Sequence, residues 1–444
     1  MHPSPPADPA HRRTLVLAVV SFALSALWLV CWPNTYMGSD ATLYEGISAN
    51  LAAGHGYTYD LAEPFRPEIT TRPFLAYLGG ALYWLFGRHP QVLYWFNALW
   101  IAGAVALSHR LARRLFDDER AAWIGGWIVC LAPQVSGAAP SFLTEASAMF
   151  QVVAGAYLLV CWEERRNAKG LGPILWAAGT GLLLASLMLS RPNFTLAILA
   201  GSVWFGLTAL RGRWSQWSGW LACVAFGAAL GAPVLGWSAR NASLGLGFTP
   251  VGAGAGVSYV LETERFRAGI LEPRERIPAS NKRYWERPKN RLGPEALVAI
   301  DQENLAWFKK LWARRHWAII AATPRRLLHL FSNPNANAYR QAWSVQIEWL
   351  VKPLMTGYAR TLWLLTAVGA LALGGRPVAR RLWMVTLGGM VIFHALTVCN
   401  PRYLTAVIPL LGPYAAVGLL ALARLPGRWR ARIRPTETGP TGAA

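Results

Sequence analysis

The segment Thr14–Pro33, TLVLAVVSFALSALWLVCWP, contains no charged side chain over its whole length. Roughly 20 mostly apolar residues are what a helix needs to cross the hydrocarbon core of a bilayer. No small-residue cleavage site precedes Asp40, so the segment is typical of an anchor and not of a cleaved signal peptide. It predicts a first membrane-spanning helix.

The rest of the chain repeats this pattern. Hydrophobic residues make up 54% of the sequence and charged residues only 15%, with 23 Trp. Further apolar runs occupy about 91–108, 121–139, 142–162, 171–189, 193–210, 216–238, 354–374, 382–399 and 403–424. We therefore expect an all-α polytopic membrane protein with about ten transmembrane helices, juxtamembrane helices in the first outer loop, and one long, partly helical outer loop.

Basic residues give the orientation. Six basic clusters fall on one face if the spans alternate: 11–13, 110–114, 163–169, 211–213, 376–381 and 428–434. Because short cytoplasmic loops are rich in Lys and Arg, that face is predicted to be cytoplasmic. Much of the net charge of +21 is then a topology signal, and we do not expect nucleic-acid binding.

The spans and loops divide the chain into successive regions. We expect a cytoplasmic N-terminus (1–13), a transmembrane core (14–238) with its first outer loop at 34–90, a long extracytoplasmic loop (239–352), C-terminal transmembrane helices (353–424) and a cytoplasmic basic tail (425–444).

The first outer loop places Asp40 a few residues beyond the first span, in water but beside the lipid headgroups. Two interpretations stand. Asp40 can cap a helix over 41–53 that Gly54 and Gly56 end. It can also be a catalytic carboxylate with Tyr44 beside it, because residues four apart share a helix face. Further on, 76–86 is too short to span and predicts a helix on the membrane surface.

The long outer loop contains helical spacing from Glu303 to Leu330, with a break at Thr323-Pro324. One face is apolar and the other basic. The apolar positions are Leu305, Phe308, Leu311 and Trp312, and the basic ones Lys309, Lys310, Arg314 and Arg315. Such a helix can lie in the membrane interface with its basic side toward lipid phosphates, or it can belong to a helical cap packed on the spans.

Several segments together resemble the GT-C membrane glycosyltransferases, in the branch that includes protein O-mannosyltransferases and lipid A aminoarabinose transferases. The first is Asp40 with Tyr44 and the ending Gly54-His55-Gly56-Tyr57. The others are Arg72–Gly87, Leu111–Phe116, Leu143-Thr144-Glu145, Arg240–Gly256, Trp317–Pro334 and Pro401–Pro409. The departures are Phe74 for a second Pro, Gly38-Ser39-Asp40 for Asp-Glu, and Glu145 for Asp. The lack of a paired Asp-Glu argues against a protein mannosyltransferase.

This resemblance implies transfer of a sugar, hexosyl or pentosyl, from a polyprenyl-phosphate carrier outside the cytoplasmic membrane, with inversion at the anomeric carbon. The acceptor is a lipid, a glycan or a protein, and membrane lipids surround the enzyme. It implies no certain cofactor and leaves a divalent metal open. No His or Cys pattern forms a zinc site.

The same resemblance assigns roles to residues on the outer face. Asp40 is the candidate base, with Glu145 orienting the acceptor or sharing that role, and Tyr44 orienting Asp40. Glu145 can instead be a helix-start residue favoured by the dipole. Arginine suits the lipid phosphate because it grips two oxygens at once. The candidates are Arg66, Arg72, Arg325, Arg326 and Arg402.

Two other classes of membrane protein fit parts of the sequence. A transporter of a lipid-linked or small anionic substrate also has about ten spans, but it usually shows internal repeats and charges within the spans. The sequence shows neither feature clearly. A non-enzymatic membrane scaffold gives no reason for an acid and several arginines at one leaflet.

Overall fold

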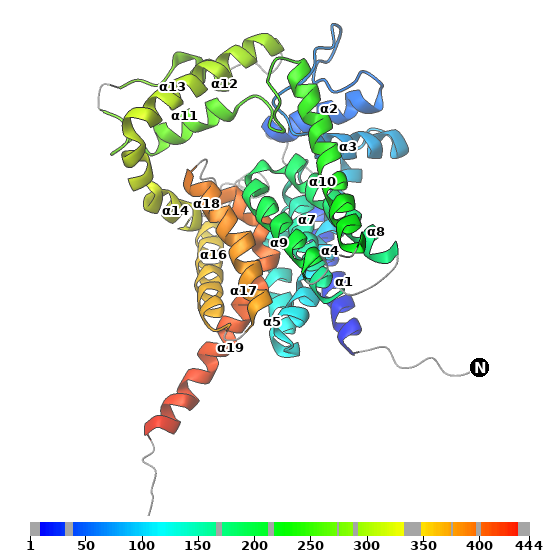
Figure 1. Cartoon of the computed structure of the whole chain (residues 1–444), viewed down its shortest axis with the longest axis vertical. Helices are drawn as coiled ribbons and strands as arrows, with labels where there is room; N and C mark the ends of the chain where they lie inside the picture. Colours follow the sequence, from blue (N-terminus) through cyan, green and yellow to red (C-terminus); the bar gives the residue numbers. More distant parts are fainter. Residues whose placement is uncertain are drawn as a thin grey trace, which may run out of the picture.

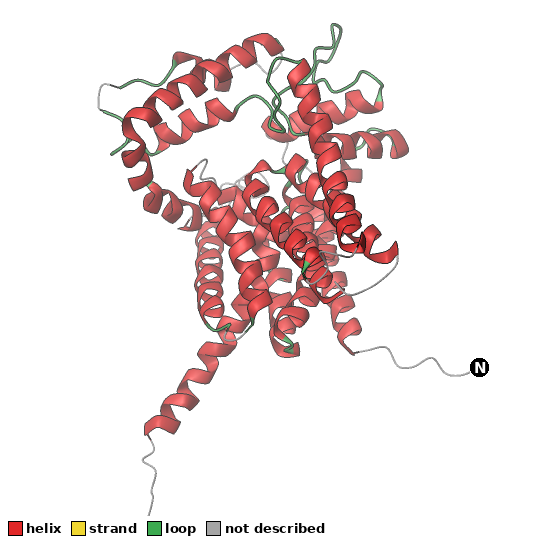
Figure 2. Ribbon diagram, in the orientation of Figure 1, coloured by secondary structure: helices red, strands yellow, loops and turns green. Residues whose placement is uncertain are grey.

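The computed structural model of the chain describes residues 9–31, 39–165, 171–211, 217–272, 275–286, 292–332, 348–373, 376–396 and 401–433. These residues form helices and loops (Figure 2), and the only β-pairing among them is a single bridge between Thr58 and Pro67. Residues 1–8 of the predicted N-terminal region (1–13), residues 434–444 of the predicted tail (425–444), and residues 333–347 of the long outer loop lie outside the described residues.

Seven helical segments are long and apolar enough to cross a membrane. They are α1 (Pro9–Cys31), α4 (Pro90–Phe116), α7 (Glu145–Arg165), α8 (Leu171–Ser190), the segment Pro192–Leu210 that joins the short η1 (Pro192–Phe194) to α9 (Thr195–Leu210), α10 (Trp217–Ser243), and Arg402–Arg424, which includes much of α19 (Ile408–Ile433). Each matches a predicted span. The expected all-α polytopic membrane protein is confirmed.

The other three predicted spans take different forms. The run 121–139 becomes α5 (Glu119–Cys130) and the short α6 (Pro133–Ser136), because a proline has no N–H to continue the helical ladder. The run 382–399 is divided among α17 (Pro377–Trp383), a π-helical turn η3 (Met384–Gly388) and α18 (Gly389–Leu396). The run 354–374 falls on α16 (Glu348–Leu371), which is 24 residues long but is not among the seven.

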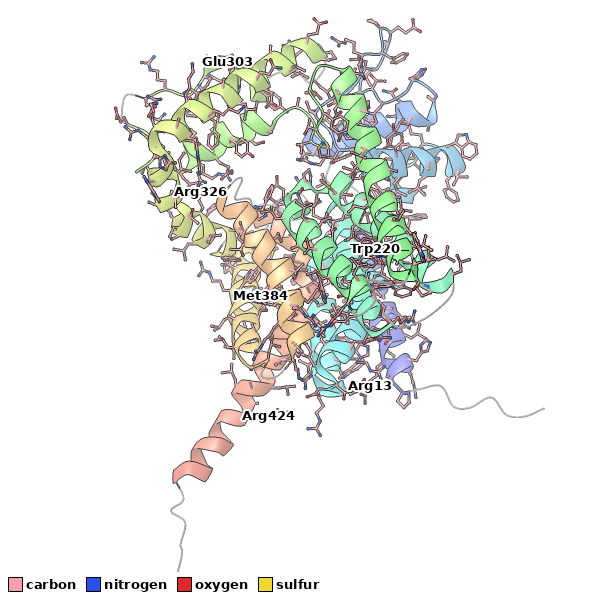
Figure 3. All side chains as sticks on the ribbon, viewed as in Figure 1. Arg13, Trp220, Glu303, Arg326, Met384 and Arg424 are labelled. Carbon is pink, nitrogen blue, oxygen red and sulfur yellow. The ribbon has the colours of Figure 1, made fainter. Side chains whose placement is uncertain are left out.

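The spanning helices form one bundle with outer helices at one end (Figure 1). In that view α1 begins and α19 ends at the bottom, while α2, α3 and α11–α13 lie at the top. Figure 3 labels Arg13 and Arg424 at the lower end and Glu303 at the upper end. Arg13 and Arg424 thus lie at the end of the bundle opposite to the outer helices, and the assignment of that end to the cytoplasm stays a prediction.

The first outer loop contains α2 (Ser39–Ala52) and α3 (Pro73–Phe86). As expected, the chain leaves α2 through Gly54 and Gly56, both with φ of +82°, a conformation that glycine adopts at no steric cost. Because α2 begins at Ser39, Asp40 lies in its first turn and not at the predicted cap position before residue 41. Helix α3 packs on α2 and leaves Tyr77, Trp84, Leu85 and Phe86 exposed, as a helix on a membrane surface would.

The long outer loop forms α11 (Ala255–Arg265), α12 (Ala279–Glu286), α13 (Pro294–Ala321) and α14 (Thr323–Ser332). The helix break is confirmed at Ala322, and α13 begins earlier than predicted. Its apolar face packs inside this cap, where Leu311 is buried against Phe266 and Ile270. Its basic face forms ion pairs within the loop, from Arg314 to Glu275 at 3.1 Å and from Arg315 to Glu272. Helix α14 joins the cap to α16 and α18.

Candidate active site

Arg402 connects the two predicted carboxylates. Its Nη1 lies 2.9 Å from Oδ2 of Asp40, and its Nε donates to Oε1 of Glu145. The three residues come from α2, from the start of α7, and from η4 (Pro401–Val407), the 3₁₀ segment before α19. Residues separated by up to 362 positions in the chain thus meet at the upper end of the bundle.

A second arginine completes the charge cluster from inside the bundle. Arg191 Nη2 lies 3.0 Å from Glu145 Oε1, and Arg191 Nε donates to Thr144 Oγ1 at 3.0 Å. The side chains of Arg191 and Glu145 are only 4% and 5% exposed. Pro192 ends α8 just after Arg191 and begins η1, so the arginine lies at a turn and not in a continuous helix.

The ring of Tyr403 packs against Arg191. The guanidinium of Arg191 lies 5.6 Å from the centre of the Tyr403 ring. The ring of His394 stacks on Tyr403, with 5.4 Å between the two ring centres. A cation over an aromatic face is stabilised by the ring quadrupole. Tyr403 therefore contacts the charge cluster through Arg191.

Tyr44 is close enough to Arg72 and to the charge cluster for its hydroxyl to be affected by all of them. Its side chain is buried, and burial raises the pKa of the hydroxyl, although the nearby guanidinium of Arg72 acts to lower it. The charges of Asp40, Arg402 and Arg191 also act on this hydroxyl. A tyrosine that keeps its proton can donate a hydrogen bond but cannot serve as a base, and an orienting role for Tyr44 stays a prediction.

Three polar atoms around the cluster are buried without a hydrogen-bond partner in the described part of the chain: Arg72 Nε, Glu145 Oε2 and Arg191 Nη1. Leaving such groups unpaired is costly in a buried setting. In contrast, the side chain of Asp40 is 55% exposed. The arrangement thus offers an accessible carboxylate that can accept a proton, beside guanidinium groups that can bind an anion.

The other predicted phosphate ligands make contacts elsewhere. Arg66 closes a turn of the first outer loop, with Nη2 at 2.9 Å and Nε at 3.2 Å from the oxygens of Asp60. Arg325 donates to the carbonyl of Ala268 at 3.2 Å. Arg326 is buried with its guanidinium 5.7 Å from the centre of the Phe266 ring. The structure brings Asp40, Tyr44, Glu145 and Arg402 together, and Arg72 with them.

The described residues contain no group of three or more His, Cys, Asp or Glu side chains that is close enough to hold a metal ion. The two carboxylates of the cluster both face Arg402.

Arg191 is the one member of this cluster, besides Thr144, that was not among the candidate site residues predicted from the sequence. Its signal is visible in retrospect, because Ser190-Arg191-Pro192 places one arginine between two apolar helices. A charge at such a position must find a partner. Its partner could not be predicted from local patterns, because Glu145 lies 46 residues earlier in the chain, at the start of another helix.

Known structures share this fold. The archaeal oligosaccharyltransferase AglB from Archaeoglobus fulgidus, solved with an inhibitory peptide and a dolichol-phosphate, matches with a TM-score of 0.53 and 17% identity over 94% of this chain and 51% of AglB. The chain thus spans about half the length of AglB. Two structures of ArnT from Cupriavidus metallidurans each match with a TM-score of 0.40 and 17% identity. The match to ArnT bound to undecaprenyl phosphate covers 95% of this chain and 81% of ArnT. The match to ArnT in the apo state covers 97% of this chain and 82% of ArnT.

No protein-family model and no curated protein sequence matches the chain. What the comparisons show is a fold shared with AglB, and this agrees with the fold that the sequence resemblance implied.

Proposed function

We propose that the chain is an inverting membrane glycosyltransferase. It transfers one monosaccharide, hexosyl or pentosyl, from a polyprenyl-phosphate carrier to an acceptor hydroxyl at the outer face of the cytoplasmic membrane. The observation that supports this most is the meeting of Asp40 and Glu145 on Arg402, with Arg191 and Arg72 beside them. The fold shared with an oligosaccharyltransferase agrees with it.

Asp40 is the base in this proposal. As the acceptor oxygen attacks the anomeric carbon, its proton passes to Asp40 and the bond from that carbon to the phosphate oxygen breaks. A positioned base contributes typically ~10²–10⁴-fold to such a step. Asp40 suits this role because its carboxylate is the exposed one of the pair, whereas Glu145 is buried between two arginines.

The leaving group is a lipid phosphate, so the protein mainly has to hold its negative charge. Arginine stays charged and offers two parallel hydrogen bonds to phosphate oxygens. Arg402 is the first candidate, because it already binds carboxylates at this position. Arg72 is the second, because its buried Nε has no partner within the described residues. Glu145 then acts as the anchor that positions both Arg402 and Arg191.

The location also suits a lipid-linked donor. The cluster lies where the spans meet the outer helices, and α3 beside it carries an exposed aromatic face. A donor whose chain stays in the bilayer can present its phosphate at this height. The acceptor is a lipid, a glycan or a protein hydroxyl that approaches from the outer side, where Asp40 is exposed.

The test is complementation of a deletion strain. Mass spectrometry of its envelope lipids, glycans and proteins should show the loss of one sugar, and the wild-type gene should restore it. Asp40→Asn should fail to restore the product at normal expression, since Asn has nearly the same shape but cannot take the proton. Asp60→Asn is the matched control, because Asp60 lies in the same loop but pairs with Arg66.

Glu145→Gln should cause a smaller loss of product than Asp40→Asn. Full restoration of the sugar by Asp40→Asn would refute Asp40 as the base. A deletion strain with an unchanged envelope would count against the transferase itself.

A further inference from the structure

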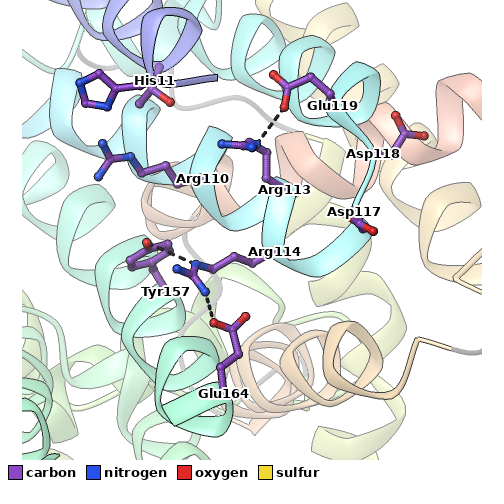
Figure 4. Close-up of a pocket in the computed structure, with 10 residues that line it drawn as sticks. His11, Arg110, Arg113, Arg114, Asp117, Asp118, Glu119, Tyr157 and Glu164 are labelled. Atoms are coloured by element: carbon purple, nitrogen blue, oxygen red, sulfur yellow. Dashed lines mark hydrogen bonds and ion pairs between the residues drawn. The ribbon is translucent and has the colours of Figure 1, made fainter. Parts of the chain in front are cut away.

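A polar pocket of about 700 Å³ lies at the end of the bundle opposite the charge cluster. It is formed by the first turns of α1, the last turn of α4, the start of α5 and the end of α7 (Figure 4). The predicted topology puts this end of the bundle at the cytoplasmic surface. The proposed transfer reaction makes no use of it.

One side of this pocket is basic. Figure 4 shows Arg110 between His11 and the pair formed by Arg114 and Tyr157. Arg110 is exposed, and within the described part of the chain no hydrogen bond or ion pair of its side chain is found. Arg114 bonds to Glu164 and to the Tyr157 hydroxyl, at 3.3 Å for the latter. Arg110 is therefore the exposed basic side chain of the pocket that remains available to an anion.

The acidic side chains of the pocket either pair with other groups or lie far from Arg110. Glu119 pairs with Arg113 at 2.8 Å and with Arg13 at 3.0 Å. Asp118 accepts hydrogen bonds from two backbone N–H groups at the start of α5. Asp117 lies across the pocket from Arg110 in Figure 4. The acids therefore do not neutralise Arg110.

An apolar surface continues from the basic side of the pocket. Leu15 and Val19 of α1 are 57% and 58% exposed. They follow His11 by four and eight residues, so they lie above it on the same face of the helix. A molecule with a phosphate at Arg110 and apolar chains along α1 would match both surfaces.

We propose that this pocket binds the phosphate of an anionic phospholipid headgroup, with Arg110 as its principal ligand and the acyl chains along Leu15 and Val19. Arginine matches phosphate through paired hydrogen bonds. Basic pockets between spanning helices at the cytoplasmic side are suited to lipid headgroups. A soluble phosphate ester has the same charged group but cannot use the apolar surface of α1.

The experiment uses the full-length protein purified in a neutral detergent, without donor or acceptor. Lipid binding is counted by native mass spectrometry, and thermal unfolding is followed in parallel. The probes are phosphatidylglycerol, phosphatidylcholine and soluble glycerol phosphate. The variants are Arg110→Gln and the matched control Arg120→Gln, because Arg120 is exposed on α5 at the same end of the bundle but does not line the pocket.

Phosphatidylglycerol should bind more tightly than phosphatidylcholine and should raise the unfolding temperature of the wild type and of Arg120→Gln. Arg110→Gln should bind it about fivefold more weakly, the effect of removing one arginine near an anionic headgroup. An equal response to glycerol phosphate would support the phosphate site but assign it to a soluble ligand. Equal binding of phosphatidylglycerol by Arg110→Gln and Arg120→Gln would overturn the proposal.

Discussion

The buried pair of Glu145 and Arg191 allows a sharp test of the charge cluster. If Glu145 only complements the dipole of α7, Glu145→Gln should destabilise the protein by about 0.3–1 kcal/mol. If it compensates Arg191, the same change leaves a guanidinium that is 4% exposed without a counter-charge. Removing one partner of a buried pair costs about 3–5 kcal/mol. We expect about 3 kcal/mol, because Gln can still accept one hydrogen bond from Arg191.

A double-mutant cycle separates the two explanations. Arg191→Gln alone should cost less than Glu145→Gln, because Glu145 keeps its bond to Arg402. Glu145→Gln combined with Arg191→Gln removes both charges, so its cost should be smaller than the sum of the single changes. The interaction energy should be at least about 1.5 kcal/mol, within the range for residues in direct contact.

The assay is denaturant unfolding in mixed micelles, followed by the fluorescence of the 23 Trp residues. The pair Arg66–Asp60 is the internal control, since its arginine is 39% exposed and an exposed pair contributes about 0–1 kcal/mol. Costs that simply add for Glu145→Gln and Arg191→Gln would refute the idea that each compensates the other.

Three further outcomes follow from the structure. Arg402→Ala and Arg72→Ala should weaken use of the lipid donor. Lys at either position should restore only part of the donor use, because an ammonium lacks the planar fork of a guanidinium. Wild-type donor kinetics in both Ala variants would show that the phosphate binds elsewhere. Reporter fusions should indicate the cytoplasm after Arg114, Arg166, Arg213 and Arg381 and the outside within 260–340, and an outside signal after Arg166 would contradict this topology. Partial burial acts to raise the pKa of Asp60, but hydrogen bonds from Arg66 lower this pKa overall. The pair should therefore stabilise the first outer loop at a pH above the unfolded pKa of about 3.9, and this stabilisation should be lost as the pH falls through the folded-state pKa. Hydrogen exchange of the loop should show this pH dependence in the wild type and not in Arg66→Ala.

Local sequence patterns predicted those elements whose formation depends on nearby residues. The apolar runs predicted the seven long helices, Gly54 and Gly56 predicted the end of α2, and Thr323-Pro324 predicted the break between α13 and α14. Hydropathy alone predicted a span over 121–139, but Pro133 divides that run because it lacks the N–H that a continuous helix needs.

Contacts between distant residues were less predictable. The alternation of spans placed Asp40, Glu145 and Arg402 on one face, but it could not show that Arg402 bonds to both acids. Arg66 and Arg72 are the same residue type and lie only six residues apart in the sequence. The structure separates them, because a turn of the loop pairs Arg66 with Asp60 while Arg72 lies beside Tyr44.

The charges of the cluster fit the proposed reaction at both of its ends. Asp40 and Glu145 balance Arg191 and Arg402, so Arg72 leaves one positive charge. The proposed donor, a sugar linked to a polyprenyl phosphate, is a phosphodiester with one negative charge, so its binding would make the site neutral. Transfer leaves a phosphate monoester with a charge of about −1.5 to −2 at pH 7, while Asp40 has gained the acceptor's proton and lost its own charge. The added charge on the product is then matched by the charge removed from Asp40. Because Glu145 is buried and already paired with both Arg191 and Arg402, the cluster has few counter-charges to spare. It thus favours a carboxylate base next to the arginines that would hold the phosphate, and Asp40, with its exposed side chain, occupies that position.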